Sequence, residues 1–305
     1  MNNEKKIIIG SRKSLLAMKQ SKIVMENLNV IFPNYTFEIK GIITSGDRLK
    51  TWPKNQSKGM FVKEIEEALI RGEIDFAVHS MKDLPVDMPD GLEIAAITKR
   101  EKHGDVLISR NLKKLTELEI GSCVGTSSPR RKMQLLLIRD DLKIADIRGN
   151  LDTRLKKLEN GEYDAIVVAA AGILRLGWLN RITEYLSDDI MLPAPAQGAL
   201  GIQIRKNDKK IQTLIKKLNF KKTEIEVKAE REFLRAMGGG CRVPIGALAR
   251  VKAEALHIEA IVIKNKTNFC RTAVKGSKKN PQILGKKLAK KIKTILMKKA
   301  QKRGE

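Results

Sequence analysis

Alternation between short apolar runs and stretches of helical periodicity constrains the fold of this chain more than any other feature. The apolar run at 6–10 precedes a helical pattern over 14–30, and residues 37–44 again have the composition of a strand. A helical face over 62–69 is followed by the apolar run Ile74–His79. Strand–helix–strand order of this kind predicts an α/β domain, in which helices cover a mostly parallel sheet.

Two stretches of this alternation are close copies of each other. Residues 72–78 read Gly-Glu-Ile-Asp-Phe-Ala-Val and residues 161–167 read Gly-Glu-Tyr-Asp-Ala-Ile-Val, at an offset of 89. Residues 9–12 and 124–127 form a second pair, at an offset of 115, in which an apolar residue and a glycine lead through a hydroxyl side chain into a helix. The two pairs predict two similar α/β domains with different loop lengths, which face each other across a cleft.

The sequence after residue 192 follows another pattern. Two prolines in the segment 192–201 exclude a helix there. A helical pattern over 224–237 ends at three glycines, and two alternating strands, 247–251 and 256–263, precede a closing amphipathic helix. This order predicts a smaller C-terminal α+β domain. The expected boundaries are 1–99 with 199–217 for the first domain, 104–193 for the second and 220–305 for the third.

The chain is strongly basic, with 60 Lys and Arg against 35 Asp and Glu and a net charge of +25. Such a surplus is compatible with a nucleic-acid-binding protein. Aromatic residues make up only 4%, however, whereas proteins that bind single strands place aromatic rings beside their cations. The lysines of the closing helix also lie mainly off its apolar face. We therefore favour a solvated lysine surface and expect no specific nucleic-acid partner.

No segment has the length of a membrane span. The longest uncharged apolar stretch, 165–174, has ten residues, against about 18 for a transmembrane helix. The first residues lack the roughly 7–15 apolar positions of a signal peptide. The sequence thus predicts a cytoplasmic protein with no membrane partner.

Polar side chains follow two of the predicted strands. The segment His-Ser-Met-Lys-Asp at 79–83 carries Ser80, Lys82 and Asp83 to the carboxyl end of a strand, where α/β sheets bind ligands. The alternative is an ordinary loop in which the aspartate caps a helix. The segment Gly-Thr-Ser-Ser-Pro-Arg-Arg at 125–131 has a serine for the N-cap and a proline for the first helical turn, and its glycine allows close approach of a ligand. Helix N-termini and arginine forks both bind anions, so this segment predicts an anion site.

Four more arginines lie at the expected ends of elements rather than along solvent faces. Arginine supplies only 19 of the 60 basic residues, so its use at these loops favours recognition of carboxylates or phosphates by the planar fork. The four residues are Arg12, Arg148, Arg154 and Arg175.

Cysteine usage leaves one candidate for an accessible thiol, for which the alternative is a small buried residue in a tight loop. Cys241 lies on the glycine-rich turn 238–246, whereas Cys123 and Cys270 lie in strand-like stretches and are expected to pack. Three scattered cysteines and three scattered histidines predict neither a disulfide framework nor a metal site.

Taken together, these segments resemble the porphobilinogen deaminase (hydroxymethylbilane synthase) family over essentially the whole chain. The motifs that carry the resemblance lie at 10–14, Thr44-Ser-Gly-Asp47, 58–64, 77–83, 125–131, 148–150, 193–201 and 239–246.

The resemblance implies a three-domain transferase whose first two domains are like type II periplasmic binding proteins and whose third carries the cofactor cysteine. Its reaction is the stepwise head-to-tail condensation of four porphobilinogen molecules, with release of ammonia, onto a covalent dipyrromethane primer. Hydrolysis then releases hydroxymethylbilane for tetrapyrrole and haem biosynthesis. One dipyrromethane per chain is attached by a thioether, and the matching position is Cys241.

The resemblance also assigns roles to individual residues. Asp83 matches the catalytic aspartate, which faces the cationic intermediate formed when ammonia leaves. Lys58 is a candidate residue of a flexible loop. The cofactor-binding positions are Cys241, Ser80, Lys82, Thr126, Ser127, Ser128, Arg130, Arg131 and Arg154. The substrate-binding positions are Arg12, Ser14, Arg148, Arg154 and Arg175.

The family further implies a monomer that passes its product to uroporphyrinogen-III synthase. Two alternatives from other classes are a nucleic-acid-binding protein and an anion-binding receptor of the periplasmic type. Neither needs Cys241 together with Asp83, and the receptor is disfavoured by the N-terminal sequence.

Overall fold

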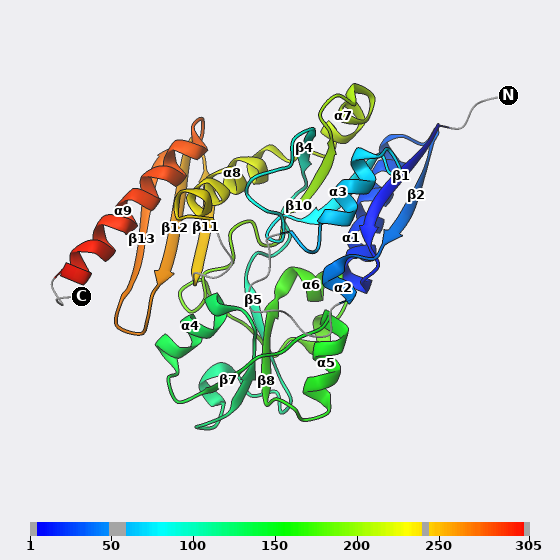
Figure 1. Ribbon diagram of the computed structural model, residues 1–305. Coiled ribbons are helices and arrows are strands. Elements are labelled where there is room, and N and C mark those ends of the chain that lie inside the picture. Colours follow the sequence, from blue (N-terminus) through cyan, green and yellow to red (C-terminus); the bar gives the residue numbers. More distant parts are fainter. Residues whose placement is uncertain (1–4, 49–58, 240–243, 302–305) are drawn as a thin grey trace. The chain divides into compact units, whose positions relative to one another are not determined.

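The computed structural model describes residues 5–48, 59–239 and 244–301 (Figure 1). The chain divides into two compact units, Met1–Arg100 with Ala199–Glu224 and Glu101–Gly198 with Ile225–Glu305. Each unit is described by itself below. No helix in the described ranges is both long and apolar enough to cross a membrane.

The first unit is built on a five-stranded sheet in the order β2-β1-β3-β10-β4. β1 runs parallel to β2 and β3, whereas β10 runs antiparallel to β3 and β4. The strands are β1 (Lys5–Arg12), β2 (Tyr35–Ile42), β3 (Phe76–Ser80), β4 (Leu92–Ile97) and β10 (Leu200–Arg205). The helices are α1 (Leu15–Ile31), α2 (Ser45–Arg48), α3 (Lys63–Ile70), α7 (Lys209–Lys216) and the start of α8 (Lys221–Ala236).

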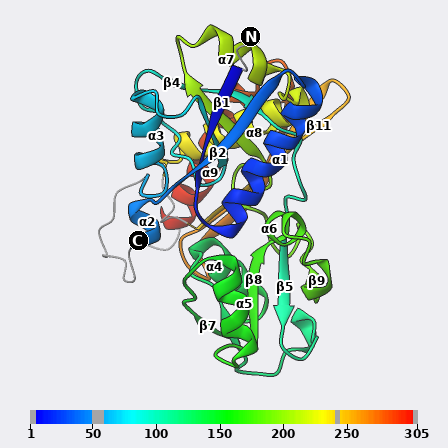
Figure 2. The same cartoon turned by 90° about the vertical axis from the view of Figure 1, so that its right-hand side faces the viewer.

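Helices cover both faces of this sheet. Val24 and Leu28 of α1 pack with Phe76 and Val78, the alternate residues of β3 that face one side. Ile65 and Leu69 of α3 pack with Ala77, which faces the other side. α1 and α3 accordingly lie on opposite sides of β1 and β2 in Figure 2. β3 is buried on both faces, which explains its continuous apolar sequence.

The second unit contains a sheet with the same arrangement and directions of strands, in the order β7-β6-β8-β5-β9. β6 is parallel to β7 and β8, and β5 is antiparallel to β8 and β9. The strands are β5 (Asp105–Ser109), β6 (Cys123–Gly125), β7 (Lys143–Ala145), β8 (Ala165–Ala169) and β9 (Glu184–Tyr185). The helices of this part are α4 (Pro129–Ile138), α5 (Leu151–Glu159) and α6 (Ala170–Arg175), with short 3-10 turns at Leu115–Glu117 and Leu179–Arg181.

The two sheets confirm the internal repeat in detail. β1 pairs with β3 so that Ile9 lies opposite Phe76, and β6 pairs with β8 so that Val124 lies opposite Ala165. These pairs are related by the offsets of 115 and 89. The aspartate of the repeated acidic turn has the same role in both copies. Asp75 accepts a hydrogen bond from the backbone N–H of Ile8 at 2.7 Å, and Asp164 accepts one from Cys123 at 2.8 Å.

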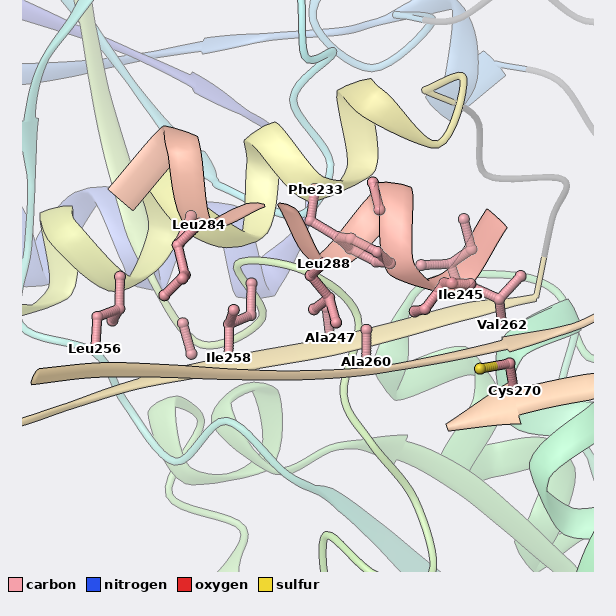
Figure 3. Close-up of a cluster of buried hydrophobic side chains, with 14 of the residues drawn as sticks. Phe233, Ile245, Ala247, Leu256, Ile258, Ala260, Val262, Cys270, Leu284 and Leu288 are labelled. Carbon is pink, nitrogen blue, oxygen red and sulfur yellow. The ribbon is translucent and has the colours of Figure 1, made fainter. Parts of the chain in front are cut away.

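The C-terminal part of the second unit is a three-stranded antiparallel sheet with helices on one face. The apolar sides of α8 and α9 pack on it through Phe233, Leu284 and Leu288 (Figure 3). The elements are β11 (Ile245–Lys252), β12 (Ala255–Ile263), β13 (Phe269–Ser277) and α9 (Pro281–Gln301). The two predicted strands, 247–251 and 256–263, are confirmed as β11 and β12. The prediction missed β13, an edge strand with one buried side chain, Cys270, which lacks regular apolar alternation.

Three outward N–H groups along the outer edge of β11 are hydrogen-bonded. Ala247 donates to the carbonyl of Pro193 at 2.9 Å. Ala249 and Val251 donate to the carboxylates of Glu230 and Glu226 at 2.8 and 3.0 Å. The proline segment and α8 thus close an edge that would otherwise be open to pairing with another strand.

Candidate active site

Basic and acidic side chains gather where the parallel strands of the first unit end. β1 ends at Arg12 and its neighbour β3 ends at Ser80, so these residues lie at the same edge of the sheet. Lys82 and Asp83 lie in the turn that follows, which is closed by a 3.0 Å hydrogen bond from the N–H of Asp83 to the carbonyl of Ser80. Asp83 is exposed and Lys82 half-buried. The structure thus places Ser80, Lys82 and Asp83 on one short turn, as the sequence predicts.

Ser14 and Ser128 have the same structural task in the two units. Each is the N-cap of the helix after the first strand of its repeat, α1 or α4, and its hydroxyl oxygen accepts the N–H of the third helical residue at 3.4 Å. Pro129 occupies the first turn of α4, as predicted. Neither hydroxyl donates a hydrogen bond to a residue that the structure describes, so each has its own hydrogen available for a ligand.

The neighbouring hydroxyls at 126 and 127 are held by the protein itself. Thr126 is buried and accepts the N–H of Ser128 at 3.3 Å. Ser127 donates its hydrogen to the carbonyl of Ile147 at 2.8 Å, so donation to a carboxylate requires that this bond break. A side chain at Gly125 would lie 2.9 Å from the ring of Tyr163, so internal packing also requires a glycine at this position.

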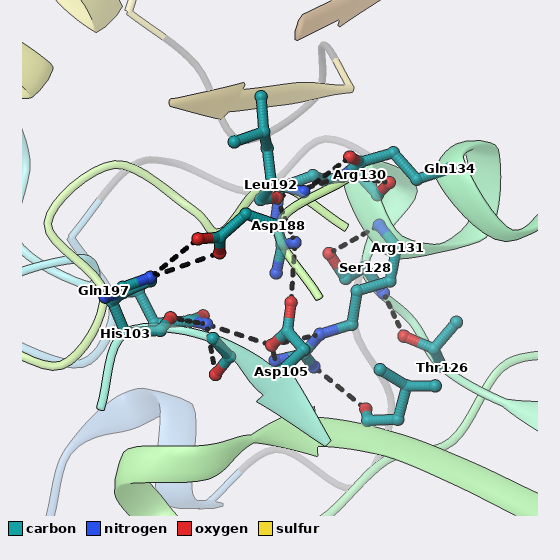
Figure 4. Close-up of polar contacts among 12 residues, drawn as sticks. His103, Asp105, Thr126, Ser128, Arg130, Arg131, Gln134, Asp188, Leu192 and Gln197 are labelled. Carbon is teal, nitrogen blue, oxygen red and sulfur yellow. Dashed lines mark hydrogen bonds and ion pairs between the residues drawn. The ribbon is translucent and has the colours of Figure 1, made fainter. Parts of the chain in front are cut away.

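The two arginines of the predicted anion site share a buried carboxylate, Asp105 (Figure 4). Nη1 of Arg130 lies 2.7 Å from Oδ2 of Asp105, and Nη2 and Nε of Arg131 lie 2.7 and 3.1 Å from Oδ1. Asp105 is completely buried, and the two arginines are only 5% and 6% exposed. Burial alone acts to raise the pKa of Asp105, but the two guanidinium groups outweigh it and hold that pKa well below its usual range. Asp105 is therefore charged in the folded protein.

Sequence reasoning missed Asp105. The available signal is an acidic residue at the start of an apolar run, 105–109, all of which is buried. A buried aspartate needs a charged partner, but the sequence alone does not say which of the basic residues provides it. A third neighbour, Gln197, donates from Nε2 to Oδ1 of Asp105 at 3.0 Å and to the carbonyl of His103 at 2.8 Å.

The charge and donors of this cluster fit an acidic ligand. Two guanidinium groups and one carboxylate leave a net charge of +1 in a nearly water-free place. Arg130 also donates to the carbonyl of Leu192, and Arg131 to that of Val167. Hydrogen bonds among the described residues therefore use five of the ten guanidinium N–H groups. The remaining donors and the surplus charge match a carboxylate-bearing group.

The other predicted arginines of the second unit differ in exposure. Arg148 is exposed at the turn before α5. Arg154, on α5, donates from Nε to the carbonyl of Gly149 at 2.9 Å, which brings it to the same turn. Arg175 ends α6, is 9% exposed and donates to the carbonyl of Gly198 at 2.6 Å. Burial lowers the pKa of Arg175 to about 10, so it stays charged at neutral pH.

Two predicted residues, Cys241 and Lys58, lie outside the described residues. The other two cysteines pack in the second unit, as expected. Burial raises the pKa of the Cys123 thiol and of the Cys270 thiol, so neither is readily ionised.

Two α/β sheets with the same order and directions of strands, each with a serine-capped helix after its first parallel strand, define a protein of the α/β class. Comparison with known families is more specific. The model described as "Porphobilinogen deaminase, dipyromethane cofactor binding domain" matches residues 7–213, and the model of the porphobilinogen deaminase C-terminal domain matches residues 224–294. The chain belongs to the porphobilinogen deaminase family.

Curated relatives agree with this assignment. The porphobilinogen deaminase of Geobacillus sp. (strain WCH70) is 49% identical over 291 residues, which are 94% of this chain and 93% of the relative. That of Bacillus subtilis (strain 168) is 52% identical over 242 residues, 78% of this chain and 77% of the relative. That of Thermus thermophilus is 43% identical over 288 residues, 94% of this chain and 95% of the relative.

Proposed function

We propose that this chain catalyses the porphobilinogen deaminase reaction with the residues described above. Four porphobilinogen molecules are condensed head to tail onto a covalent dipyrromethane, one ammonia leaves at each addition, and hydrolysis releases hydroxymethylbilane. Membership of the family supports the activity and the cofactor. The structural observation that carries the proposal is the buried Arg130–Arg131–Asp105 cluster with its net positive charge.

The arginines supply the positive charge that this reaction requires to bind its carboxylate-rich substrate and primer. Each porphobilinogen carries an acetate and a propionate, so primer and product together bring many carboxylates into the protein. Burying carboxylates without cations is prohibitively costly. We assign cofactor carboxylates to Arg130, Arg131 and Arg154, with Lys82 and the hydroxyls of Ser80, Thr126, Ser127 and Ser128 beside them. We assign substrate carboxylates to Arg12, Ser14, Arg148, Arg154 and Arg175.

Asp83 is assigned the catalytic role. Its backbone is fixed to the end of β3 by the hydrogen bond to Ser80, while its carboxylate is exposed to a ligand. A carboxylate at this place stabilises the positive charge that develops on a pyrrole when ammonia leaves, and it can hold the proton exchanged with the pyrrole nitrogen. The carbon nucleophile belongs to a pyrrole, so elongation needs no protein nucleophile.

Several finer assignments rest on the family alone. They are attachment of dipyrromethane to Cys241, a loop role for Lys58, a monomeric state in the cytoplasm and transfer of the product to uroporphyrinogen-III synthase.

The stoichiometry of turnover tests the proposed activity. Purified protein is incubated with porphobilinogen, and substrate consumed, ammonia released and linear tetrapyrrole formed are measured together. The expected ratio is four porphobilinogen and four ammonia to one hydroxymethylbilane. Absence of porphobilinogen consumption by protein that carries its primer would contradict the proposal.

A further inference from the structure

We infer that Asp47 and Phe61 position Arg12, so that one edge of its guanidinium group is held by the protein and the other is presented to a substrate carboxylate. This inference rests on the proposed role of Arg12 and adds two positioning residues to it. It also explains the Thr44-Ser-Gly-Asp47 motif, for which the site as described so far has no use.

Asp47 holds one edge of Arg12. Nη2 of Arg12 lies 2.5 Å from Oδ1 of Asp47, and Nε lies 3.3 Å from Oδ2. This is the side-on bidentate arrangement, which fixes the plane of the guanidinium group as well as its position. The two side chains are 22% and 15% exposed, so the pair is shielded but within reach of solvent.

Thr44 fixes Asp47 in turn. Oδ2 of Asp47 accepts the Thr44 hydroxyl at 2.8 Å and the Thr44 N–H at 3.3 Å, and Thr44 is completely buried. Burial acts to raise the pKa of Asp47, but the hydrogen bonds from Arg12 and Thr44 outweigh it and lower that pKa. The aspartate is thus charged and immobilised before any ligand arrives.

Phe61 covers a face of the guanidinium group. Cζ of Arg12 lies 4.2 Å from the centre of the Phe61 ring, a cation–π contact. Gly46 makes room for this ring, since a Cβ at position 46 would lie 2.3 Å from it. The hydroxyl of Ser45 donates to the carbonyl of Met60 at 3.1 Å and ties the motif to the residue before Phe61. Each of the four residues of the motif therefore helps to hold the side chain of Arg12 in place.

One edge of Arg12 is left for a ligand. Of its five N–H groups, the two on the Nε–Nη2 edge bond to Asp47. The other three, on Nη1 and Nη2, make no further hydrogen bond to the residues that the structure describes. Their edge is the end of the fork, which binds a second carboxylate without releasing the first. A carboxylate already bound at the side makes Arg12 a rigid receptor rather than a mobile cation.

A double-mutant cycle tests this inference. The kcat and apparent KM for porphobilinogen are measured for the wild-type enzyme, Asp47→Asn, Arg12→Leu and the double variant, each loaded with its primer. We expect Asp47→Asn to raise the apparent KM roughly tenfold with little change in kcat, because it removes binding that ground and transition states share. The same substitution should have almost no effect in the Arg12→Leu background.

Two further variants serve as a control and as a second test of the role of Asp47. Glu73→Gln breaks an exposed ion pair with Lys40 in the same unit and should leave both constants unchanged. Thr44→Val keeps the shape but removes the hydroxyl donor to Asp47, so it should raise KM by a smaller factor. It tests the same role if Asp47→Asn fails to fold.

The outcomes separate this inference from the proposed function. A normal KM for Arg12→Leu would remove Arg12 from the substrate site and with it the basis of the inference. An impaired Arg12→Leu beside normal Asp47→Asn and Thr44→Val would overturn the inference and leave the proposed function intact. A lower KM for Asp47→Asn would mean that Asp47 competes with the substrate, which also overturns the positioning role.

Discussion

Asp105 accepts two hydrogen bonds from the side chain of Arg131, at 2.7 and 3.1 Å, in a place where the aspartate has no exposed surface. The same carboxylate also bonds to Arg130. One buried anion therefore sets the orientation of both arginines that we assign to the cofactor, and this dependence leads to the first prediction.

Asp105→Asn should destabilise the protein by about 3–5 kcal/mol, because it leaves two guanidinium groups buried without a counter-charge. The free energy of unfolding in urea measures this loss, and intact mass reports whether the primer is still attached. Glu159→Gln, which breaks the exposed pair with Arg181, is the control and should cost at most about 1 kcal/mol. Equal effects of the two substitutions would show that the buried charges do not depend on Asp105.

The second prediction concerns pH and His79, which is buried and bonded through Nε2 to Gln203 at 3.0 Å. Burial lowers the pKa of His79 to about 4, against about 6.5 in the unfolded chain. Between these values only the unfolded chain takes up the proton, so stability from this group is complete above pH 6.5 and declines as the pH falls towards 4. The expected loss is about 3 kcal/mol.

Urea unfolding of wild-type protein and His79→Gln at pH 7, 5.5 and 4.5 measures this contribution. Glutamine can still donate to Gln203 but does not titrate. The difference in unfolding free energy between the two proteins should therefore change with pH in favour of the variant under acid conditions. An identical pH dependence for both would rule out the buried neutral histidine as its source.

The sequence predicts those features of the structure that depend on residues close together in the chain. The repeat at 72–78 and 161–167 locates β3 and β8, because glycine, an acidic turn and an apolar strand are a local pattern. The serine cap and the first-turn proline of α4 are local as well. Asp105 was missed because its partners lie 25 and 26 positions away, and only the folded sheet brings them together.

The site shows the same division. The turn with Ser80 and Asp83 follows from its place after a strand, which local sequence reveals. The contact between Asp47 and Arg12, which lie 35 positions apart, does not follow from local sequence. The two residues belong to separate motifs, and nothing in either motif indicates that they meet. The third C-terminal strand, β13, was missed because it is an edge strand in which only Cys270 is buried, so its sequence shows no regular apolar alternation.

The third prediction concerns elongation. Arg148→Leu or Arg154→Leu should stall the enzyme at partly built chains, because each change leaves a substrate carboxylate poorly paired. The loss of one charged hydrogen bond costs about 1.5–3 kcal/mol of binding free energy. Native mass spectrometry of enzyme mixed with limiting porphobilinogen measures the distribution of these complexes.

Neutralising exposed lysines of α9 provides the matched control. Lys287, Lys290 and Lys298 are exposed on that helix, where ions screen charges beyond about 8–10 Å, so their replacement by glutamine should barely alter turnover. Loss of activity in this lysine variant, together with normal elongation by both arginine variants, would refute the carboxylate-binding assignment. Salt-sensitive duplex binding that depends on α9 would instead favour a nucleic-acid role.

The fourth prediction concerns Asp83. Asp83→Asn keeps the shape of the side chain and removes its charge, so the protein should fold and carry its primer but lose turnover by several powers of ten. Electrostatic groups of this kind are commonly worth about 10²–10³ in rate, and proton transfer adds about 10²–10⁴. Single-turnover release of ammonia measures the loss. Near-normal release would remove Asp83 from the mechanism.

The intact mass of the purified protein, followed by a peptide map, tests the central claim most directly. We predict that active protein is heavier than its sequence by two linked pyrrole units and that the addition lies on Cys241. Cys241→Ser should lose both the addition and the activity, whereas Cys123→Ser should keep both. Fully active protein of unmodified mass, with Cys241 present as a free thiol, would contradict the account.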